Sequence, residues 1–466
     1  MKRFSPHHRR IGVTMLVTLL LAPVILPAQS SAPPVSAPAA APEPTPAADP
    51  AAAPAPATPP ASSLAQLSPL ASLPDWNELA AYAGTLSREE FESALTEVFL
   101  PDSPFPSPWV VGPDGVEIQT GQSQPASLKI PFLQRGQTAT PPKRYWKTAA
   151  ELPPLKDETQ PLTDIHIAID PGHIGGGYGV MEERRLSFAP GEAIQEGDLT
   201  LLTAQVLEQR LKALGAYVTL VRKTAAPVTE RRPIDFLLTA RNLLSANGFP
   251  NPTESYAGLQ GDIRMLTVQW QSEKLFYRVA EIHSRADHLN QEIRPDLALC
   301  LHFNAEAWGD SADPQYSDKN HLHLMINGCY SLNEIATQDI RFEMMRRIFS
   351  KAYQEELALV QPLARSLAIT TRLPPYVYTT PNARRVTADS YVYARNLLAN
   401  RLYQCPVIYF EPYVMNHRET YQRLLRGHWI GRTLIGDQLQ TSAIEDYVEG
   451  IVRGLTEYYR SQRPSA

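Results

Sequence analysis

The sequence has 466 residues, and its 43 lysines and arginines against 48 aspartates and glutamates give a formal net charge of -5. This length allows two or three domains, and the slightly acidic balance excludes the overall basic surface typical of proteins that bind nucleic acid. The three cysteines, Cys300, Cys329 and Cys405, are too few and too scattered for a disulfide framework or a thiolate zinc site. We expect them to be small buried apolar residues.

The first 28 residues have the pattern of a secretory signal peptide. Four basic residues precede an uncharged apolar run at 11–26, and the small residue Ala28 follows it. The run is shorter than the roughly 20 residues that span a bilayer as a helix. We therefore expect residues 1–28 to be a cleaved signal, with an uncleaved membrane anchor as the alternative. The protein would then be exported to the periplasm or cell envelope.

Residues 29–74 are rich in proline and alanine, and 11 of the 43 prolines lie within 31–60. Proline lacks the backbone N–H that helices and sheets require, so this density predicts an extended, disordered linker. Such a linker could carry the folded part away from a membrane or through a wall, or it could have no further role.

Residues 75–150 predict a small α+β module of unknown role. Ser87 and Glu90 form a capping box, and apolar residues at helical spacing extend the predicted helix over 88–99. A turn rich in glycine and proline joins two short apolar runs at 109–111 and 116–118, which predicts a β-hairpin. The module could bind the wall or a partner protein, or it could support the main domain.

Residues 160–462 alternate between strand and helix patterns. This alternation predicts an α/β fold, a three-layer αβα arrangement with a mainly parallel central sheet. Helices are expected over 197–214 and from Ser442 to about residue 459. The expected strands are 165–170, 217–221, 297–302, 322–326 and 407–410.

Three of these strands end at residues with metal-site chemistry: His173, His302 and Glu411. Because ligands bind at the carboxyl ends of strands in such sheets, we expect the three side chains to converge. A catalytic Zn²⁺ takes three protein ligands and keeps one open position. Glu196 begins the helix after the first strand and is a candidate third ligand, while Glu411 is placed to act as a general base.

Five segments that span about 164–460 resemble, in order, the motifs of the zinc-dependent N-acetylmuramoyl-L-alanine amidases. The first is Asp170-Pro171-Gly172-His173, followed after one residue by a glycine pair. The others are Gln195-Glu196-Gly197-Asp198-Leu199-Thr200-Leu201, Gly215-Ala216-Tyr217-Val218-Thr219-Leu220-Val221-Arg222, Leu301-His302-Phe303-Asn304-Ala305, and Pro406-Val407-Ile408-Tyr409-Phe410-Glu411 with Asn416 beyond it.

This resemblance implies that His173, Glu196 and His302 bind Zn²⁺ and that Glu411 is the catalytic carboxylate. It implies cleavage of the amide between N-acetylmuramic acid and L-alanine, with peptidoglycan as substrate and a protein activator as a further partner. Two other functions stay open: an exported zinc amidase or peptidase that acts on another N-acyl amide, and a non-catalytic wall-binding regulator. The presence of Glu411 beside a full ligand set argues against the regulator.

The chain departs from the family pattern at Ile174, which separates His173 from the glycine pair, and at Pro412-Tyr413 after Glu411, and two further departures concern the second carboxylate ligand and access to the site. The 23-residue step from His173 to Glu196 is long for the family. It contains Glu183, which is the alternative to Glu196 as the carboxylate ligand. Residues 225–295 form an expanded, helical insertion. We hypothesise that this insertion covers or narrows the active site; the alternative is an ordinary packed excursion.

Some polar residues in the predicted catalytic domain are expected to stay outside the metal site. His321 and His323 share one face of a predicted strand, and we expect this face not to reach the crevice at the strand ends. Arg395 and Asn396 precede the last strand and could touch substrate, but a surface or capping role is favoured.

Overall fold

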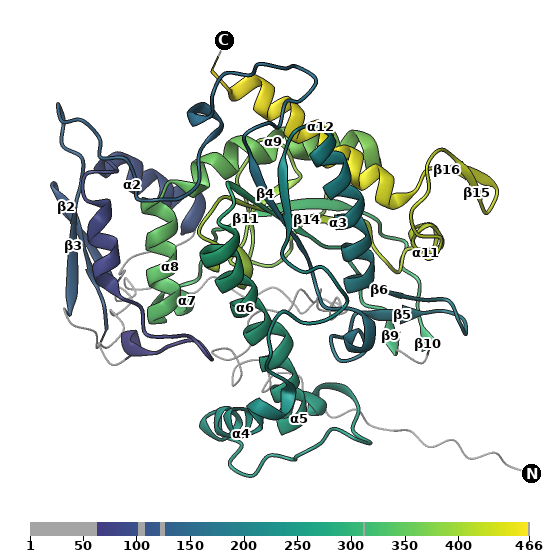
Figure 1. Ribbon diagram of the computed structural model, residues 1–466. Helices are drawn as coiled ribbons and strands as arrows, with labels where there is room; N and C mark the ends of the chain where they lie inside the picture. The colour runs from purple at the N-terminus through teal and green to yellow at the C-terminus, as the bar shows by residue number, and fades with distance from the viewer. Residues whose placement is uncertain (1–62, 101–107, 122–125, 311–312, 465–466) are drawn as a thin grey trace, which may run out of the picture. The chain divides into compact units, whose positions relative to one another are not determined.

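The computed structural model describes residues 63–100, 108–121, 126–310 and 313–464 (Figure 1). The predicted signal peptide and residues 29–62 of the predicted linker lie outside the described residues. The described residues divide into two compact units, 231–276 and the remainder of the chain, and each is described separately below. Within the described ranges, no helix has both the length and the apolar character needed to cross a membrane.

The larger unit is built on a seven-stranded sheet, as the alternating pattern predicts. Its strands lie in the order β12-β13-β11-β14-β8-β4-β7. The pairs β7–β4, β4–β8, β8–β14 and β11–β13 are parallel, whereas β11 is antiparallel to β14 and β12 is antiparallel to β13. The strands are β4 (His166–Pro171), β7 (Tyr217–Leu220), β8 (Leu297–Leu301), β11 (Leu322–Ile326), β12 (Arg384–Arg385), β13 (Val392–Ala394) and β14 (Val407–Pro412).

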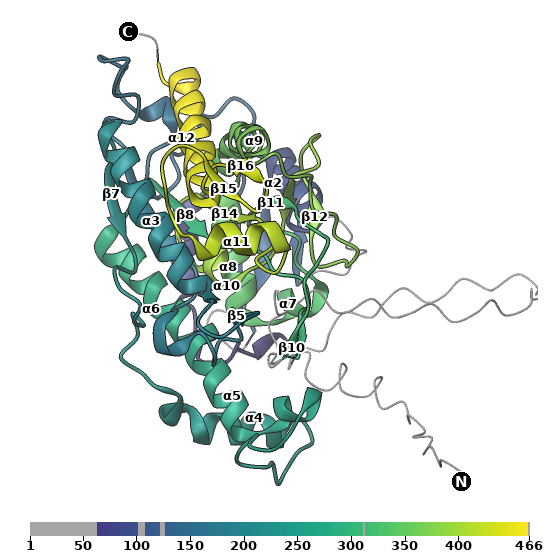
Figure 2. The same cartoon turned by 90° about the vertical axis from the view of Figure 1, so that its right-hand side faces the viewer.

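Helices cover both faces of this sheet, which confirms the predicted αβα class. Alternate strand residues divide between two apolar clusters, so that Leu299 and Leu301 face one layer while Ala298 and Cys300 face the other. Figure 2 shows α12 (Ala443–Gln462) packed along α3 (Glu196–Ala213) and α9 (Ala352–Thr371) on the first face. The second face packs against α6 (Glu281–Asp287) and α10 (Leu398–Leu402). Strands buried on both faces read as continuous apolar runs, because neither face needs polar residues.

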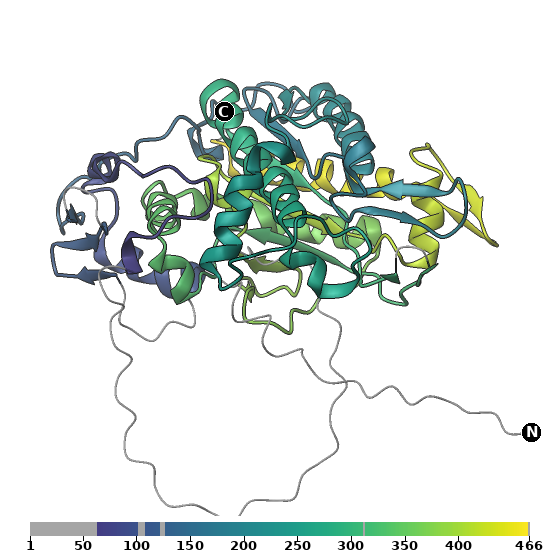
Figure 3. The ribbon, with the colours of Figure 1, turned by 90° about the horizontal axis from the view of Figure 1, so that it is seen from below.

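The segment from Trp76 to Pro131 forms a small α+β structure that packs beside α8 (Gln338–Phe349), as Figure 3 shows. It contains η2 (Trp76–Tyr82), α2 (Arg88–Ala94), a π-helical turn (Leu95–Phe99), and an antiparallel sheet of β1 (Trp109–Val111), β2 (Gly115–Gln119) and β3 (Ser127–Pro131). The third strand was not expected from the sequence. Phe91 of α2 stacks on Phe349 of α8 with ring centroids 5.6 Å apart, so the two parts share one apolar core.

Residues 63–74, assigned to the linker from the sequence, are folded onto the same unit. Leu64, in a 3-10 turn (Ser63–Ala65), is 1% exposed, and its carbonyl oxygen accepts a 3.0 Å hydrogen bond from Arg341. The backbone N–H of Ser68 donates to Asp339 at 2.8 Å. Residues 63–74 are therefore part of the fold, because apolar burial and hydrogen bonds hold a segment whose composition alone predicts a linker.

The smaller unit, residues 231–276, is helical. Its elements are η6 (Pro233–Phe236), α4 (Leu237–Ala246), η7 (Gly261–Leu266) and α5 (Val268–Lys274), and α4 packs on α5. Arg241 of α4 forms an ion pair with Glu254 at 2.8 Å within the unit. The chain then continues through π-helical turns (Leu275–Ala280 and His288–Ile293) on either side of α6.

The remaining elements are short and lie in the larger unit. They are η4 (Ala149–Glu151), η5 (Gly176–Tyr178), β5 (Arg185–Ser187), β6 (Ala193–Gln195), β9 (Gly309–Asp310), β10 (Asp313–Pro314), α7 (Leu332–Ala336), α11 (Arg418–Leu425), β15 (Thr433–Ile435) and β16 (Gln438–Gln440). The antiparallel pair β5–β6 leads directly into α3.

Candidate metal centre

Three adjacent parallel strands, β4, β8 and β14, end at one edge of the sheet. Leu301 of β8 is in register with both Pro171 of β4 and Phe410 of β14. His302 and Glu411 therefore lie one residue beyond the same row, and His173 lies two residues beyond Pro171. The convergence predicted from the sequence follows from this register.

Glycine allows the two histidines to approach each other. A Cβ atom at Gly172 would lie 2.3 Å from Cε1 of His302, a distance that real side chains do not adopt. The rings of His173 and His302 lie 5.2 Å apart between centroids. The motif Asp-Pro-Gly-His thus needs glycine because the imidazole of His302 occupies the space that a side chain would fill.

Glu196, the first residue of α3, lies between the two imidazoles. Its Oε2 is 3.1 Å from Nε2 of His173, and its Oε1 is 3.0 Å from Nδ1 of His302. The backbone N–H of Phe303 also donates to Oε1 at 3.2 Å. One ligand-type atom from each of His173, Glu196 and His302 lies within 4.8 Å of the others, and this is the group of described residues that could hold a metal ion.

The donor set fits Zn²⁺. Nε2 of His173 is buried and has no hydrogen-bond partner, although Glu196 lies close to it. A buried polar atom without a partner costs about 1–3 kcal/mol, and a bound cation would remove this cost. Two imidazoles and one carboxylate are zinc ligands with bond lengths of about 2.0–2.2 Å, so atoms that share one ion lie close to the separations found here.

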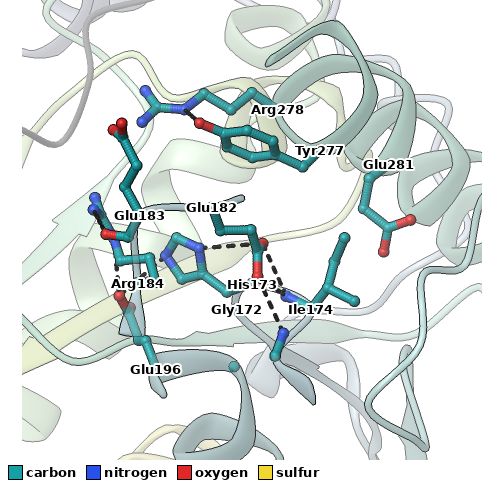
Figure 4. A network of polar contacts seen from close by, with 12 residues as sticks. Gly172, His173, Ile174, Glu182, Glu183, Arg184, Glu196, Tyr277, Arg278 and Glu281 are labelled. Atoms are coloured by element: carbon teal, nitrogen blue, oxygen red, sulfur yellow. Dashed lines mark hydrogen bonds and ion pairs between the residues drawn. The ribbon is translucent and has the colours of Figure 1, made fainter. Parts of the chain in front are cut away.

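The second nitrogen of His173 faces another carboxylate, that of Glu182. Oε1 of Glu182 is 3.5 Å from Nδ1 of His173, and both its oxygens accept hydrogen bonds from the backbone N–H of Ile174 at 3.0 Å (Figure 4). A carboxylate behind a ligating histidine fixes its tautomer and raises its basicity. Glu182 was not singled out from the sequence as a site residue; its only signal there was a cluster of acidic residues in the long loop.

The electrostatics of the cluster favour cation binding. Burial disfavours the charged form of His173, but the carboxylates of Glu196 and Glu182 outweigh it and raise its pKa. The pKa of His302 is lowered, chiefly by burial. Burial also opposes ionisation of Glu196, yet His173 and His302 hold the pKa of Glu196 below its ordinary value. A metal ion must displace the proton of His173, so its binding competes with protons.

The structure separates the two candidate second ligands, Glu196 and Glu183. Glu183, with a left-handed φ of 55°, extends toward Tyr277 and Arg278 and away from His173 (Figure 4). Its neighbour Arg184 turns the other way, and Nε of Arg184 lies 3.2 Å from Oε2 of Glu196. Glu183 is therefore not brought together with the two histidines, whereas Glu196 is.

Glu411, on β14, is 4% exposed. Burial, and then the negative charge of Glu196, raise the pKa of Glu411 to about 8. A carboxyl group with a pKa near the working pH can both accept and donate a proton. Glu411 thus has the properties of a general acid–base group beside the ligand cluster.

His321 and His323 are not part of the ligand group, but the reason expected from the sequence was wrong. Strand β11 runs antiparallel to β14, so its first residues lie at the same edge as the end of β14. His323 is directly opposite Glu411 in this register. The strand direction could not be read from the sequence, because it depends on pairing between distant segments.

The fold and the site together define an αβα protein with a His-Glu-His cluster of metal-ligand type and an acid–base carboxyl group beside it. No protein-family model matches the sequence. No curated protein matches it in a sequence search either.

Solved structures that resemble this one are N-acetylmuramoyl-L-alanine amidases, the family that the sequence motifs resemble. Ami1 from Mycobacterium smegmatis has 13% identity and a TM-score of 0.34, and the match covers 65% of this chain and 99% of that chain. The amidase from Clostridium difficile 630 has 15% identity, a TM-score of 0.33 and coverage of 64% and 98%. CwlD from Clostridioides difficile, solved in complex with the GerS lipoprotein, has 10% identity, a TM-score of 0.36 and coverage of 64% and 100%.

Proposed function

We propose that this protein is a zinc-dependent N-acetylmuramoyl-L-alanine amidase that hydrolyses the amide between N-acetylmuramic acid and L-alanine in peptidoglycan. The observation that carries the proposal is the placement of His173, Glu196 and His302 around one point, with the buried carboxyl group of Glu411 on the neighbouring strand. The identity of the substrate is inferred from the resemblance of the sequence motifs quoted above.

In this proposal His173, Glu196 and His302 hold the zinc ion, and Glu182 orients His173 from behind. The ion would supply Lewis-acid polarisation of the scissile carbonyl and activation of the attacking water. Glu411 takes one proton from that water as its oxygen adds to the carbonyl carbon. The same carboxyl group then delivers the proton to the amide nitrogen as the C–N bond breaks, which yields a lactyl carboxylate and a free L-alanine amine.

Peptidoglycan digestion tests the reaction. Purified peptidoglycan is treated with the wild type and with Glu411→Ala, each with and without a chelator, and Glu183→Gln serves as the matched acidic control. New L-alanine amino termini are expected from the wild type and from Glu183→Gln, but not from Glu411→Ala or from chelated enzyme. Reducing sugar ends, or cuts within the peptide, would show that another bond is the substrate.

The proposed architecture follows the sequence. Residues 1–28 serve as the export signal, a Pro/Ala-rich linker follows it, the 75–150 module precedes the 160–462 catalytic domain, and the protein acts in the periplasm or cell envelope during wall remodelling. Cell fractionation with detection of the mature N-terminus tests the localisation. Recovery of the full-length chain in the cytoplasm would contradict it.

A further inference from the structure

A connected polar group lies beside Glu411. Its members are His323, Tyr378 and Arg395, here called the 323–378–395 wall. His323 is directly opposite Glu411 in the β11–β14 pair, so the two side chains project from the same face of the sheet. Arg395 follows β13, and Tyr378 lies in the loop between α9 and β12.

The hydrogen bonds of the wall define which atoms are donors. Nη1 of Arg395 donates to the Tyr378 hydroxyl at 3.3 Å, and that hydroxyl lies 3.0 Å from Nε2 of His323. Burial, followed by the charges of His321 and Arg395, lowers the pKa of His323 well below its ordinary value, so the ring is neutral. Because Arg395 already donates to the hydroxyl and nitrogen is a better acceptor than sulfur, we assign the phenol proton to Nε2, which leaves the imidazole's own proton on Nδ1. The sulfur of Met325, 3.4 Å from the hydroxyl, is a weaker acceptor.

Two donors of the wall have no acceptor among the described residues: Nδ1 of His323 and Nε of Arg395. The two side chains are 3% and 5% exposed, respectively. Among the other buried arginines, Arg285 and Arg347 pair with carboxylates, whereas Arg222, Arg341 and Arg401 donate to backbone carbonyl or side-chain amide oxygens. The only hydrogen bond of the Arg395 side chain within the described chain goes to a neutral phenol. A buried guanidinium with free donors is complementary to a carboxylate supplied from outside.

His323 lies one cross-strand step from Glu411, and residues along a bound peptide are separated by steps of comparable length. Side chains directly opposite each other in a sheet have Cβ atoms about 4.5–5.5 Å apart. Successive Cα atoms along a peptide are about 3.8 Å apart. If Glu411 serves the amide before L-alanine, a group on the next residue of the stem would reach His323 and Arg395. In a peptidoglycan stem that residue is D-glutamate linked through its γ-carboxyl group, which leaves its α-carboxyl group either free or amidated.

We propose that the 323–378–395 wall binds the free α-carboxylate of this second stem residue and selects it over the amidated form. The inference rests on the proposed function, because that function places the stem peptide beside Glu411. Arg395 pairs with the carboxylate through Nε–H, and His323 donates to it through Nδ1–H. The half-buried ring of Tyr376 packs against His323, with the two ring centroids 4.9 Å apart.

Binding to the metal-free full-length protein tests the wall without any turnover. The probes are L-alanyl-D-glutamate and its α-amide, L-alanyl-D-isoglutamine, each with its γ-carboxyl group blocked as the methylamide, titrated by calorimetry. The wild type is expected to bind the carboxylate at least about tenfold more tightly than the amide, since one charge-assisted contact is lost in the amide. Equal affinity for the two dipeptides overturns the inference.

Matched variants assign the preference to particular atoms. Arg395→Gln and His323→Gln are expected to bind both dipeptides equally, whereas His323→Asn, which keeps an N–H near the Nδ1 position, retains the preference. Arg385→Gln, at an exposed position on the neighbouring strand β12, is expected to behave as the wild type. Circular dichroism checks folding; if Arg395→Gln does not fold, the His323 pair and the wild-type discrimination decide the outcome. A preference that survives in His323→Gln contradicts the assignment.

Hydrolysis by the zinc-loaded protein separates this inference from the proposed function. N-acetylmuramoyl-L-alanyl-D-glutamate and its isoglutamine form, both with the γ-carboxyl group blocked as the methylamide, are compared as substrates, and kcat/KM is expected to favour the α-carboxylate in the wild type only. If neither compound is cleaved, the proposed function fails. The calorimetry then still measures whether the 323–378–395 wall prefers the carboxylate over the amide. If both are cleaved with equal kcat/KM, the function stands and the wall does not select the carboxylate.

Discussion

Nη2 of Arg285 donates a 2.8 Å hydrogen bond to the carbonyl oxygen of His173. Through Nη1 the same guanidinium reaches the carbonyl of Pro171 at 2.8 Å and Oδ1 of Asp170 at 2.9 Å, and its Nε pairs with Glu281 at 2.8 Å. Arg285 lies on α6, within the stretch that the sequence marks as an insertion. The insertion therefore contributes a residue that holds the loop carrying His173, a proposed zinc ligand.

Replacing Arg285 should weaken the metal site without touching a ligand. Arg285→Lys keeps the charge but loses the planar fork that bridges these four partners, so we expect zinc affinity to fall about 10–100-fold. Arg285→Met leaves Asp170 and Glu281 as unpaired buried charges and should cost about 3–5 kcal/mol of unfolding free energy. Competition with a chromophoric chelator and urea denaturation measure the two effects. Wild-type affinity in a folded Arg285→Lys protein would contradict this role.

Deletion of residues 231–276 should leave the rest folded. Both backbone N–H groups at Val228 and Thr229 donate to the Glu281 carboxylate, at 3.1 and 2.9 Å, so the two ends of the excised segment are held together by what remains. With a short glycine-serine bridge, we expect zinc binding to persist and hydrolysis of soluble muropeptides to equal or exceed that of the wild type. A folded, zinc-loaded deletion variant without activity would contradict the hypothesis that the insertion covers the site. Deletion of all of 225–295 should instead abolish zinc binding, because it removes Arg285.

Glu196 and Glu183 are the two candidates for the carboxylate ligand, and the zinc affinities of their variants can be compared directly. Loss of a residue that only hydrogen-bonds to a metal ligand lowers metal affinity about 10–100-fold. Glu196→Gln should lower zinc affinity by more than this, because Glu196 itself lies between the two imidazoles. Glu183→Gln should leave the affinity unchanged. Metal titration of both proteins measures this, and the reverse order would assign the ligand to Glu183.

The carboxyl group of Glu411 should make the stability of the metal-free protein fall as pH rises. Its ordinary pKa is 4.5 and its folded pKa is about 8. Between these values the folded state binds more protons than the unfolded state, so the free energy of unfolding decreases with increasing pH in this window. From pH 6 to pH 8.5 we expect Tm to fall more for the wild type than for Glu411→Gln, which cannot ionise. Parallel Tm curves for the two proteins would contradict the raised pKa.

The N-terminal module and the sheet domain should unfold together. Phe91 is fully buried against Phe349 in the shared core, so Phe91→Ala should cost about 3–5 kcal/mol, as deletion of a large core side chain does. Urea denaturation followed by fluorescence and circular dichroism should show one transition shifted to lower urea. Val110→Ala, at a position 66% exposed, is the control and should change little. Two separate transitions would mean that the module folds on its own.

The sequence by itself determined the strands β4, β8 and β14, the start of α3, and the convergence of His173, His302 and Glu411. These follow from local patterns, because a buried parallel strand is an apolar run and its carboxyl end is marked by the first polar residue. The antiparallel direction of β11, which sets His323 beside Glu411, was decided only by the tertiary structure. The orientation of Glu196 rather than Glu183 toward the histidines, and the reach of Arg285 to the His173 loop, were decided in the same way. Each of these depends on register and packing between segments far apart in the chain, which no local periodicity encodes.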